Sequence, residues 1–130
     1  WGGRSAVRTK AQEYALRIFP QVSGMSDAGQ QARAKYGSMA HKLPVLIRTA
    51  GLAQALGFVE SRGTPEQKKL IQHISEAIGV PDMCERSRKA ELHEYMALTS
   101  NVMAALVWYK RFATSVLGVQ SDVDVEDVGE

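Results

Sequence analysis

The sequence has one cysteine and no long uninterrupted apolar run. Cys84 cannot form an internal disulfide, so the fold gains nothing from oxidation and a reducing cytoplasm is the expected location. A membrane helix needs about 18 consecutive apolar residues. The stretch 43–59 comes nearest to this length but is interrupted by Arg48 and two other polar residues. We therefore expect a single cytoplasmic domain with its own hydrophobic core and no membrane contact.

Recognisable catalytic and metal-binding motifs are also lacking. The three histidines, His41, His73 and His93, are far apart, and no second cysteine is present to complete a zinc signature. The sequence has no phosphate-binding glycine loop and no serine nucleophile elbow. His93 has acidic neighbours, Glu91 and Glu94, which could form an acid/base cluster, although such a group is more often a solvated helix face. We expect no enzyme activity, no metal and no cofactor.

Acidic residues are scarce in the first half of the chain. Residues 1–62 carry nine Lys and Arg against three Asp and Glu. Five acidic residues follow Gly118 with no basic residue among them, which leaves 16 basic against 9 acidic residues in the rest of the chain. The amino-terminal half is therefore the part to which a polyanion would be attracted.

Helical periodicity is the dominant pattern, and it predicts an all-α, compact, single-domain bundle of about five to six helices. A first helix is predicted to end at Pro20, and a second to be capped by Ser26 or Asp27. The inward faces of these two helices are predicted to hold Val7, Ala11, Tyr14, Ala15 and Ile18, and then Ala28, Ala32, Tyr36, Met39 and Ala40.

Pro44 is predicted to begin a third, central helix, because proline suits the first turn. Along that helix, Arg48 would share a stripe with Gly51 and Ala55, whose small side chains would let another backbone approach. Arg48 has two readings from the sequence: a contact to an outside partner, or an internal ion pair with an acid such as Asp27 or Glu60.

The second half of the body contains clear helix signals. Gly63 is predicted to be a left-handed helix stop, Thr64 to Gln67 to form a capping box, and Gly79 to end the next helix. One long helix, or two nearly collinear ones, is then predicted. Its inward positions would be Leu92, Met96, Thr99, Met103, Leu106, Ala113 and Leu117.

These patterns place the bundle domain at residues 1–117 and an acidic tail at 118–130. Within the tail, the stretch 119–130, VQSDVDVEDVGE, alternates valine with acids, and the tail is expected to be flexible. Two other readings are that it folds back as a counter-charge to the basic body, or that it adds an edge strand to a partner.

A helix-turn-helix DNA reader is one alternative function. The stretch 74–92, ISEAIGVPDMCERSRKAEL, has a helix, a turn and a basic segment with Arg86, Arg88 and Lys89. A glycine followed by Pro81 and Asp82 is equally typical of one helix ending and another being capped. A second alternative is a protein-interaction bundle whose basic charge meets acidic partners.

Four stretches, in this order and spacing, carry a family resemblance: Tyr14-Ala15, KYGSMAHK at 35–42, the overlapping KLPVLIRTAGLAQALGF at 42–58, and WYKRFA at 108–113. Together they resemble the small, all-helical subunit of the Cmr-type (type III-B) CRISPR RNA-targeting effector complex, over about residues 4–117. Ala50 departs from the pattern, since a polar residue is expected there.

The resemblance implies a small helical protein without catalytic residues. Copies would stack beside the backbone subunits and next to the large subunit of a ribonucleoprotein complex that contains guide RNA. A basic face would help hold the target RNA along the guide, in antiviral defence. This role needs positive charges that contact phosphates, and it needs no side chains that form hydrogen bonds to the edges of bases. The residues predicted to bind RNA are Arg17, Arg33, Lys35, Lys42, Arg48, Lys110 and Arg111.

Some of these residues have plainer readings. Lys110 and Arg111 could be ordinary solvent-facing charges of an amphipathic helix. Trp108, Tyr109 and Phe112 could stack on bases, but aromatic residues at this spacing belong more often to a core or a subunit interface.

Overall fold

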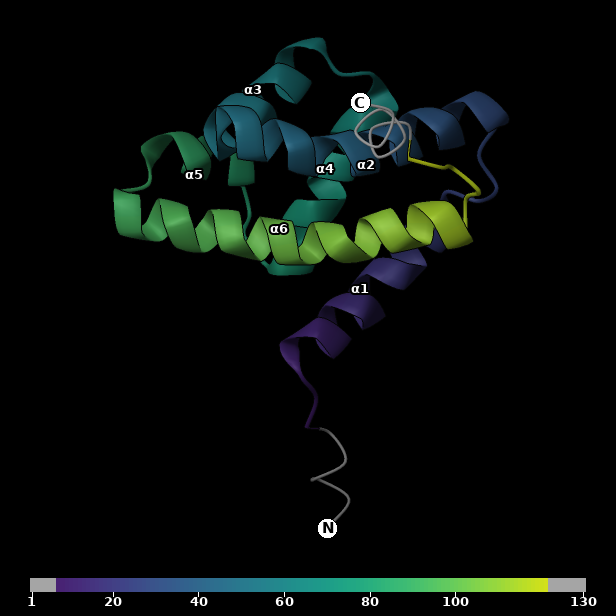
Figure 1. Ribbon diagram of the computed structural model, residues 1–130, viewed down its shortest axis with the longest axis horizontal. Coiled ribbons are helices and arrows are strands. Elements are labelled where there is room, and N and C mark those ends of the chain that lie inside the picture. The colour runs from purple at the N-terminus through teal and green to yellow at the C-terminus, as the bar shows by residue number, and fades with distance from the viewer. Residues whose placement is uncertain (1–6, 122–130) are drawn as a thin grey trace, which may run out of the picture.

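The chain folds as a bundle of α-helices (Figure 1). The computed structural model describes residues 7–121, and within them it contains six helices and no β-strand. The helices are α1 (Lys10–Gly24), α2 (Gln30–Ala50), α3 (Leu52–Arg62), α4 (Pro65–Ile78), α5 (Met83–Lys89) and α6 (Leu92–Ser115). The predicted all-α bundle is confirmed. Residues 122–130, which hold most of the predicted tail, lie outside the described residues, as do residues 1–6.

The two longest helices, α2 and α6, lie side by side and run in opposite directions (Figure 1). His41 of α2 is 3.4 Å from the hydroxyl of Thr114, close to the end of α6. At the other end of the pair, the backbone N–H of Ala53 donates to the hydroxyl of Tyr95, in the first turn of α6 (3.0 Å). Helix α4 packs against both members of this pair, α1 packs against α6 and α4, and α3 packs on α2, α4 and α5.

Apolar side chains from all six helices form one core. Tyr36 and Tyr109 are the largest of the fully buried side chains. The other large, fully buried side chains are Ile18, Val22, Leu43, Leu52, Leu56, Val59, Leu70, Ile74, Met83 and Leu106. Tyr109 therefore belongs to the core, as its plainer reading held, whereas Trp108 and Phe112 are only half-buried.

A polar network joins the four central helices inside this core. The Tyr36 hydroxyl is 2.7 Å from Nδ1 of His73, and the Gln21 side chain donates to the carbonyl of His73 (3.0 Å). Gln21 also accepts a hydrogen bond from the Tyr109 hydroxyl. Burial lowers the pKa of His73, and nearby Lys69 lowers it further, against the opposing effect of Glu76. His73 is therefore neutral near pH 7 and serves as a core connection.

The local signals around α4 were read correctly with one exception. Thr64 and Gln67 form the predicted capping box, and Gly79 ends the helix in the left-handed conformation at φ 72°. Gly63 is extended, at φ −72° and ψ 154°, so the predicted left-handed stop is wrong. A glycine is still needed there, because a Cβ would lie 2.5 Å from the carbonyl oxygen of Val59.

The predicted central helix starting at Pro44 is wrong. Pro44 lies inside α2 and is buried, and the helix break falls at Gly51, whose φ of 90° favours glycine. Burial of Pro44 and its neighbour Leu43 offsets the hydrogen bond that proline cannot make. Arg48 and Ala55 are thus on different helices, and Ala55 is buried, so they share no surface stripe.

Other predicted boundaries and faces also differ. Pro20 lies within α1, where its exposed position lets water satisfy the carbonyl left without a donor. Gly29, and neither Ser26 nor Asp27, is the N-cap of α2. Four residues predicted to face inward are exposed and lie at or near the N-terminal ends of α1 and α6: Val7, Ala11, Leu92 and Met96.

Candidate nucleic-acid interface

Six of the seven residues predicted to bind RNA lie on α2 and α6, which pack side by side. Both helices lack acidic residues over most of their length, since none occurs between residues 28 and 59 or between 95 and 121. We call the exposed part of the acid-free stretches of this pair the α2/α6 surface, and its basic residues are Arg33, Lys35, Lys42, Arg48, Lys110 and Arg111. The pairing of the two helices brings together positive charges that are up to 78 residues apart in the sequence.

Two of these cations border the seam where α2 meets α6. Arg48 follows His41 by two helical turns and so lies on the same side of α2, the side that contacts Thr114. Lys110 precedes Thr114 by about one turn and therefore lies on the side of α6 that faces α2. Arg48 is exposed and Lys110 is half-buried. Within residues 7–121 neither side chain has a hydrogen-bond or ion-pair partner. The ion pair with Asp27 or Glu60 that the sequence offered as an alternative for Arg48 is therefore not formed among the described residues, and Glu60 is paired with Arg88 instead.

Lys35 and Lys42 form a second group, which we call the lysine stripe. They are two helical turns apart on α2, which places them on one side of the helix about 10 Å apart along its axis. Both side chains are exposed and, among the described residues, have no partner. The helix has no carboxylate that could neutralise them. The lysine stripe can therefore take up two successive negative charges from outside.

The remaining two cations, Arg33 and Arg111, already make contacts within the fold. Arg33 is half-buried and donates to the carbonyl of Ser26 (3.2 Å). The guanidinium of Arg111 lies over the ring of Trp108, with 5.2 Å between Cζ and the ring centroid. This cation–π contact keeps the Arg111 charge exposed while orienting it.

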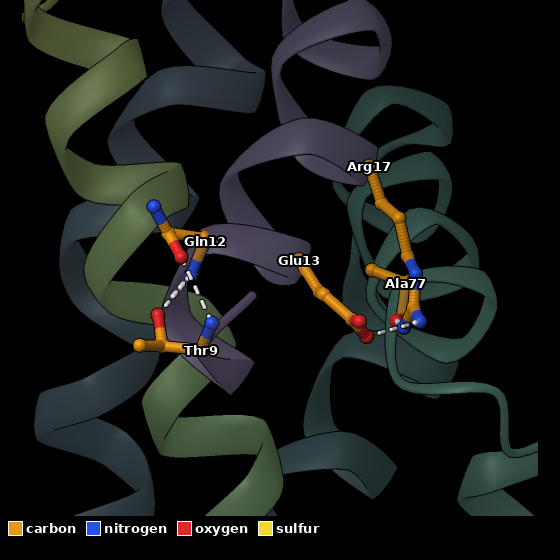
Figure 2. A network of polar contacts seen from close by, with 5 residues as sticks. All are labelled: Thr9, Gln12, Glu13, Arg17 and Ala77. Atoms are coloured by element: carbon orange, nitrogen blue, oxygen red, sulfur yellow. Dashed lines mark hydrogen bonds and ion pairs between the residues drawn. The ribbon is translucent and has the colours of Figure 1, made fainter. Parts of the chain in front are cut away.

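Arg17 lies apart from the α2/α6 surface, on α1 (Figure 2). Its Nη1 donates to the carbonyl of Ala77 at the end of α4 (2.8 Å), and its Nη2 is 3.3 Å from Oε1 of Glu13. Figure 2 shows the side chain extended from α1 toward both groups. A cation at a helix C-terminus satisfies a free carbonyl and complements the helix dipole. The geometry therefore favours a structural role for Arg17.

The basic side chains of the segment considered as a DNA reader also have partners within the fold. Helix α5 has only seven residues, and its three basic side chains each lie beside a carboxylate. The pairs are Arg86–Glu94 (3.2 Å), Arg88–Glu60 (3.1 Å) and Lys89–Glu85 (3.2 Å). The three carboxylates offset the three positive charges of this segment, so the structure does not supply the surplus of basic charge that the helix-turn-helix alternative needs there.

A hollow of about 320 Å³ lies between α3, α4 and α5. Its lining includes the apolar side chains of Val59 and Met83, and also Cys84. Burial, together with the negative charge of Glu60, raises the pKa of the Cys84 thiol to about 11. The thiol is therefore protonated near pH 7 and is a poor nucleophile.

The described residues offer no other reactive constellation. Glu94, predicted as a neighbour of His93 in an acid/base cluster, is in an ion pair with Arg86. No group of three metal-ligating side chains occurs among residues 7–121. In the same part of the chain, no helix has the length and apolar character of a membrane span.

The sequence pointed to the basic residues of the α2/α6 surface, but it did not show that α2 and α6 pack side by side. Counting acids in the amino-terminal half missed that 95–121 is equally free of them. The signal was present in the sequence, as 27 residues without Asp or Glu. What it could not supply was the antiparallel contact between α2 and α6.

Comparison with known proteins matches residues 10–116 to the family described as CRISPR-associated protein (Cas_Cmr5). The chain is 41% identical, over 114 residues, to the CRISPR system Cmr subunit Cmr5 of Thermus thermophilus; the match covers 85% of this chain and 98% of that protein. The crystal structure of a CRISPR-associated Cmr5 family protein from the same organism superposes with a TM-score of 0.79. It is 40% identical, and the superposition covers 85% of this chain and 99% of that one.

Proposed function

Because the chain belongs to the Cmr5 family of CRISPR-associated proteins, we propose that it is a non-catalytic subunit of a Cmr effector complex and holds RNA on its α2/α6 surface. The observation that carries the RNA part of the proposal is the packing of α2 against the acid-free stretch of α6 that follows Glu94. Lys35, Lys42, Arg48 and Lys110 leave four positive charges there without a partner among the described residues.

The chemistry of this surface suits a phosphate backbone. Lysine and arginine neutralise phosphates and release counterions, which gives affinity without sequence preference. In an RNA-guided complex the sequence is read by base pairing, so a subunit that only holds the strand needs no contacts to base edges. The expected ligands are the target RNA and the guide RNA paired with it.

A second surface suits contacts with proteins. Leu16 and Phe19 of α1 are 56% and 49% exposed. Phe19 meets Phe112 of α6 edge to face, with ring centroids 5.3 Å apart, and Phe112 also contacts Trp108. Exposed aromatic groups of this kind favour protein contacts. We assign this surface to neighbouring subunits, which include further copies of the chain, the backbone subunits and the large subunit.

The RNA proposal is tested by the salt dependence of binding to an unstructured single-stranded RNA. Each phosphate contact contributes about −0.7 to the slope of log K against log salt for single strands, so Lys35→Gln with Lys42→Gln should flatten the slope by about 1.4. The matched control is Lys68→Gln with Lys69→Gln, which removes the same charge from exposed positions on α4. The control should leave the slope near that of the wild type.

Three results would contradict the proposal. Equal losses in the two double variants would mean that net charge alone attracts the RNA. Tight binding to one palindromic DNA duplex would instead favour a DNA-binding regulator. Absence of any nucleic-acid binding at low salt would leave the protein-interaction role.

A further inference from the structure

The chain continues to pack on α2 after α6 has ended. Val119 lies against Gly37, and the Nε2–H of His41 donates to the carbonyl of Val119 (2.9 Å). The backbone N–H of Val119 in turn donates to the carbonyl of Ala113 (2.9 Å). Leu117, two residues earlier, is buried. The segment 117–119 is therefore fixed to the body at the middle of α2.

The next residue lies close to the lysine stripe. Gln120 lines a hollow of about 300 Å³ together with Ala34 and Ser38 of α2. On the helical wheel, Ser38 lies about 40° from Lys42 and about 60° from Lys35. The chain consequently leaves the described body one helix row away from the lysine stripe.

The residues that follow are opposite in charge to α2. Residues 122–130 contain five carboxylates and no basic residue, whereas α2 contains four basic residues and no acidic one. The family match ends at residue 116, so this acidic segment lies outside the part shared with the family. We propose that residues 122–130 bind the lysine stripe of the same chain and compete there with RNA phosphates.

Length and tethering both permit this contact. Nine residues span up to about 30 Å when extended, about three times the axial separation of Lys35 and Lys42. A segment joined to its site by a short linker has an effective concentration of about millimolar, so weak charge contacts suffice. Screening should release the segment as the ionic strength rises, because the Debye length falls to about 8 Å at physiological salt.

The contact between residues 122–130 and the lysine stripe is tested separately from the competition with RNA. Only the competition rests on the proposed function. The test variant keeps the full chain and neutralises all five acids by Asp122→Asn, Asp124→Asn, Glu126→Gln, Asp127→Asn and Glu130→Gln. The contact is measured without RNA, from the NMR signals of the lysine side chains at low salt. The signals of Lys35 and Lys42 should shift between wild type and variant, and that of Lys68 on α4 should not.

The competition is measured with the same unstructured single-stranded RNA. The neutralised variant should bind about threefold or more tightly at low salt, and the difference should vanish at high salt. In a Lys35→Gln and Lys42→Gln background the gain should shrink, because a double-mutant cycle isolates action through the lysine stripe from the general effect of net charge.

The outcomes are distinguishable. Unchanged Lys35 and Lys42 signals would overturn the inference even if RNA binds as expected. Shifted signals in a protein that binds no RNA would support the contact and refute the RNA part of the proposed function. Shifted signals with an equal RNA gain in the Lys35→Gln and Lys42→Gln background would overturn the competition.

Discussion

Val119 occupies the space above Gly37 that a side chain on α2 would fill. A Cβ built at residue 37 would lie 2.7 Å from the Cβ of Val119, closer than two carbon atoms can approach. The C-terminal segment is therefore seated on α2 through a glycine.

Gly37→Ala should dislodge this segment. Alanine improves helix propensity by about 1 kcal/mol, but the clash with Val119 forces the segment away and exposes its apolar contacts, so we expect a net loss of stability of about 1 kcal/mol. Hydrogen exchange of the Val119 amide should accelerate in the variant. Adding Val119→Gly should restore part of the loss, and a double variant no better than Gly37→Ala would show that the clash lies elsewhere.

Arg17→Ala should destabilise the fold through the end of α4. Its loss leaves the carbonyl of Ala77 without its donor and removes a cation from the helix terminus, at a cost of about 1–2 kcal/mol in urea unfolding. Glu13→Gln is the control, because it keeps the bond from Arg17 to Ala77 while removing the exposed ion pair and a first-turn carboxylate of α1, and it should cost less than about 1 kcal/mol. Equal effects of the two variants would assign the stabilisation to the ion pair.

Arg48→Glu should weaken RNA binding and leave the fold intact. The side chain is exposed and, among the described residues, unpartnered, so the stability cost should be limited to the unfavourable helix dipole at the end of α2, about 0.5–1 kcal/mol. Thermal unfolding and RNA titration of the same sample measure both effects. A loss of several kcal/mol with unchanged RNA affinity of the folded protein would mean that Arg48 is a structural residue.

Stability should fall on acidification because of His73. Its pKa is lowered on folding by burial, so the unfolded state binds the proton more tightly. The stabilising contribution is complete above the unfolded pKa of 6.5 and declines as the pH falls below it. His73→Gln should reduce the change in unfolding free energy between about pH 7 and pH 5. An identical pH profile in the two proteins would assign the dependence to other groups.

The sequence predicted the elements that depend on local chemistry. The capping box at Thr64 and the left-handed Gly79 are set by neighbours within five residues, so they could be read directly. The break at Gly51 could not, because Pro44 is a typical helix-starting residue and only burial against other helices keeps it inside α2. Local preference yields to tertiary packing at such positions.

The candidate site, too, could be predicted only in part from the sequence. The basic composition of residues 1–62, together with the family resemblance, pointed to Lys35, Lys42 and Arg48. Whether a cation is free or engaged depends on partners distant in sequence, and for Arg17 that partner is the carbonyl of Ala77, 60 residues away. The buried network of Tyr36 and His73 was missed for the same reason, since their contact joins α2 to α4.

The corner between α2 and α3 also bears on the order of folding. The first turn of α3 has no cap of its own, and the N–H of Ala53 is satisfied by the hydroxyl of Tyr95, 42 residues later. During synthesis, α3 therefore leaves the ribosome well before the residue that completes its start. We expect this corner to close late, after α6 has docked, so that Tyr95→Phe should speed unfolding far more than it slows folding.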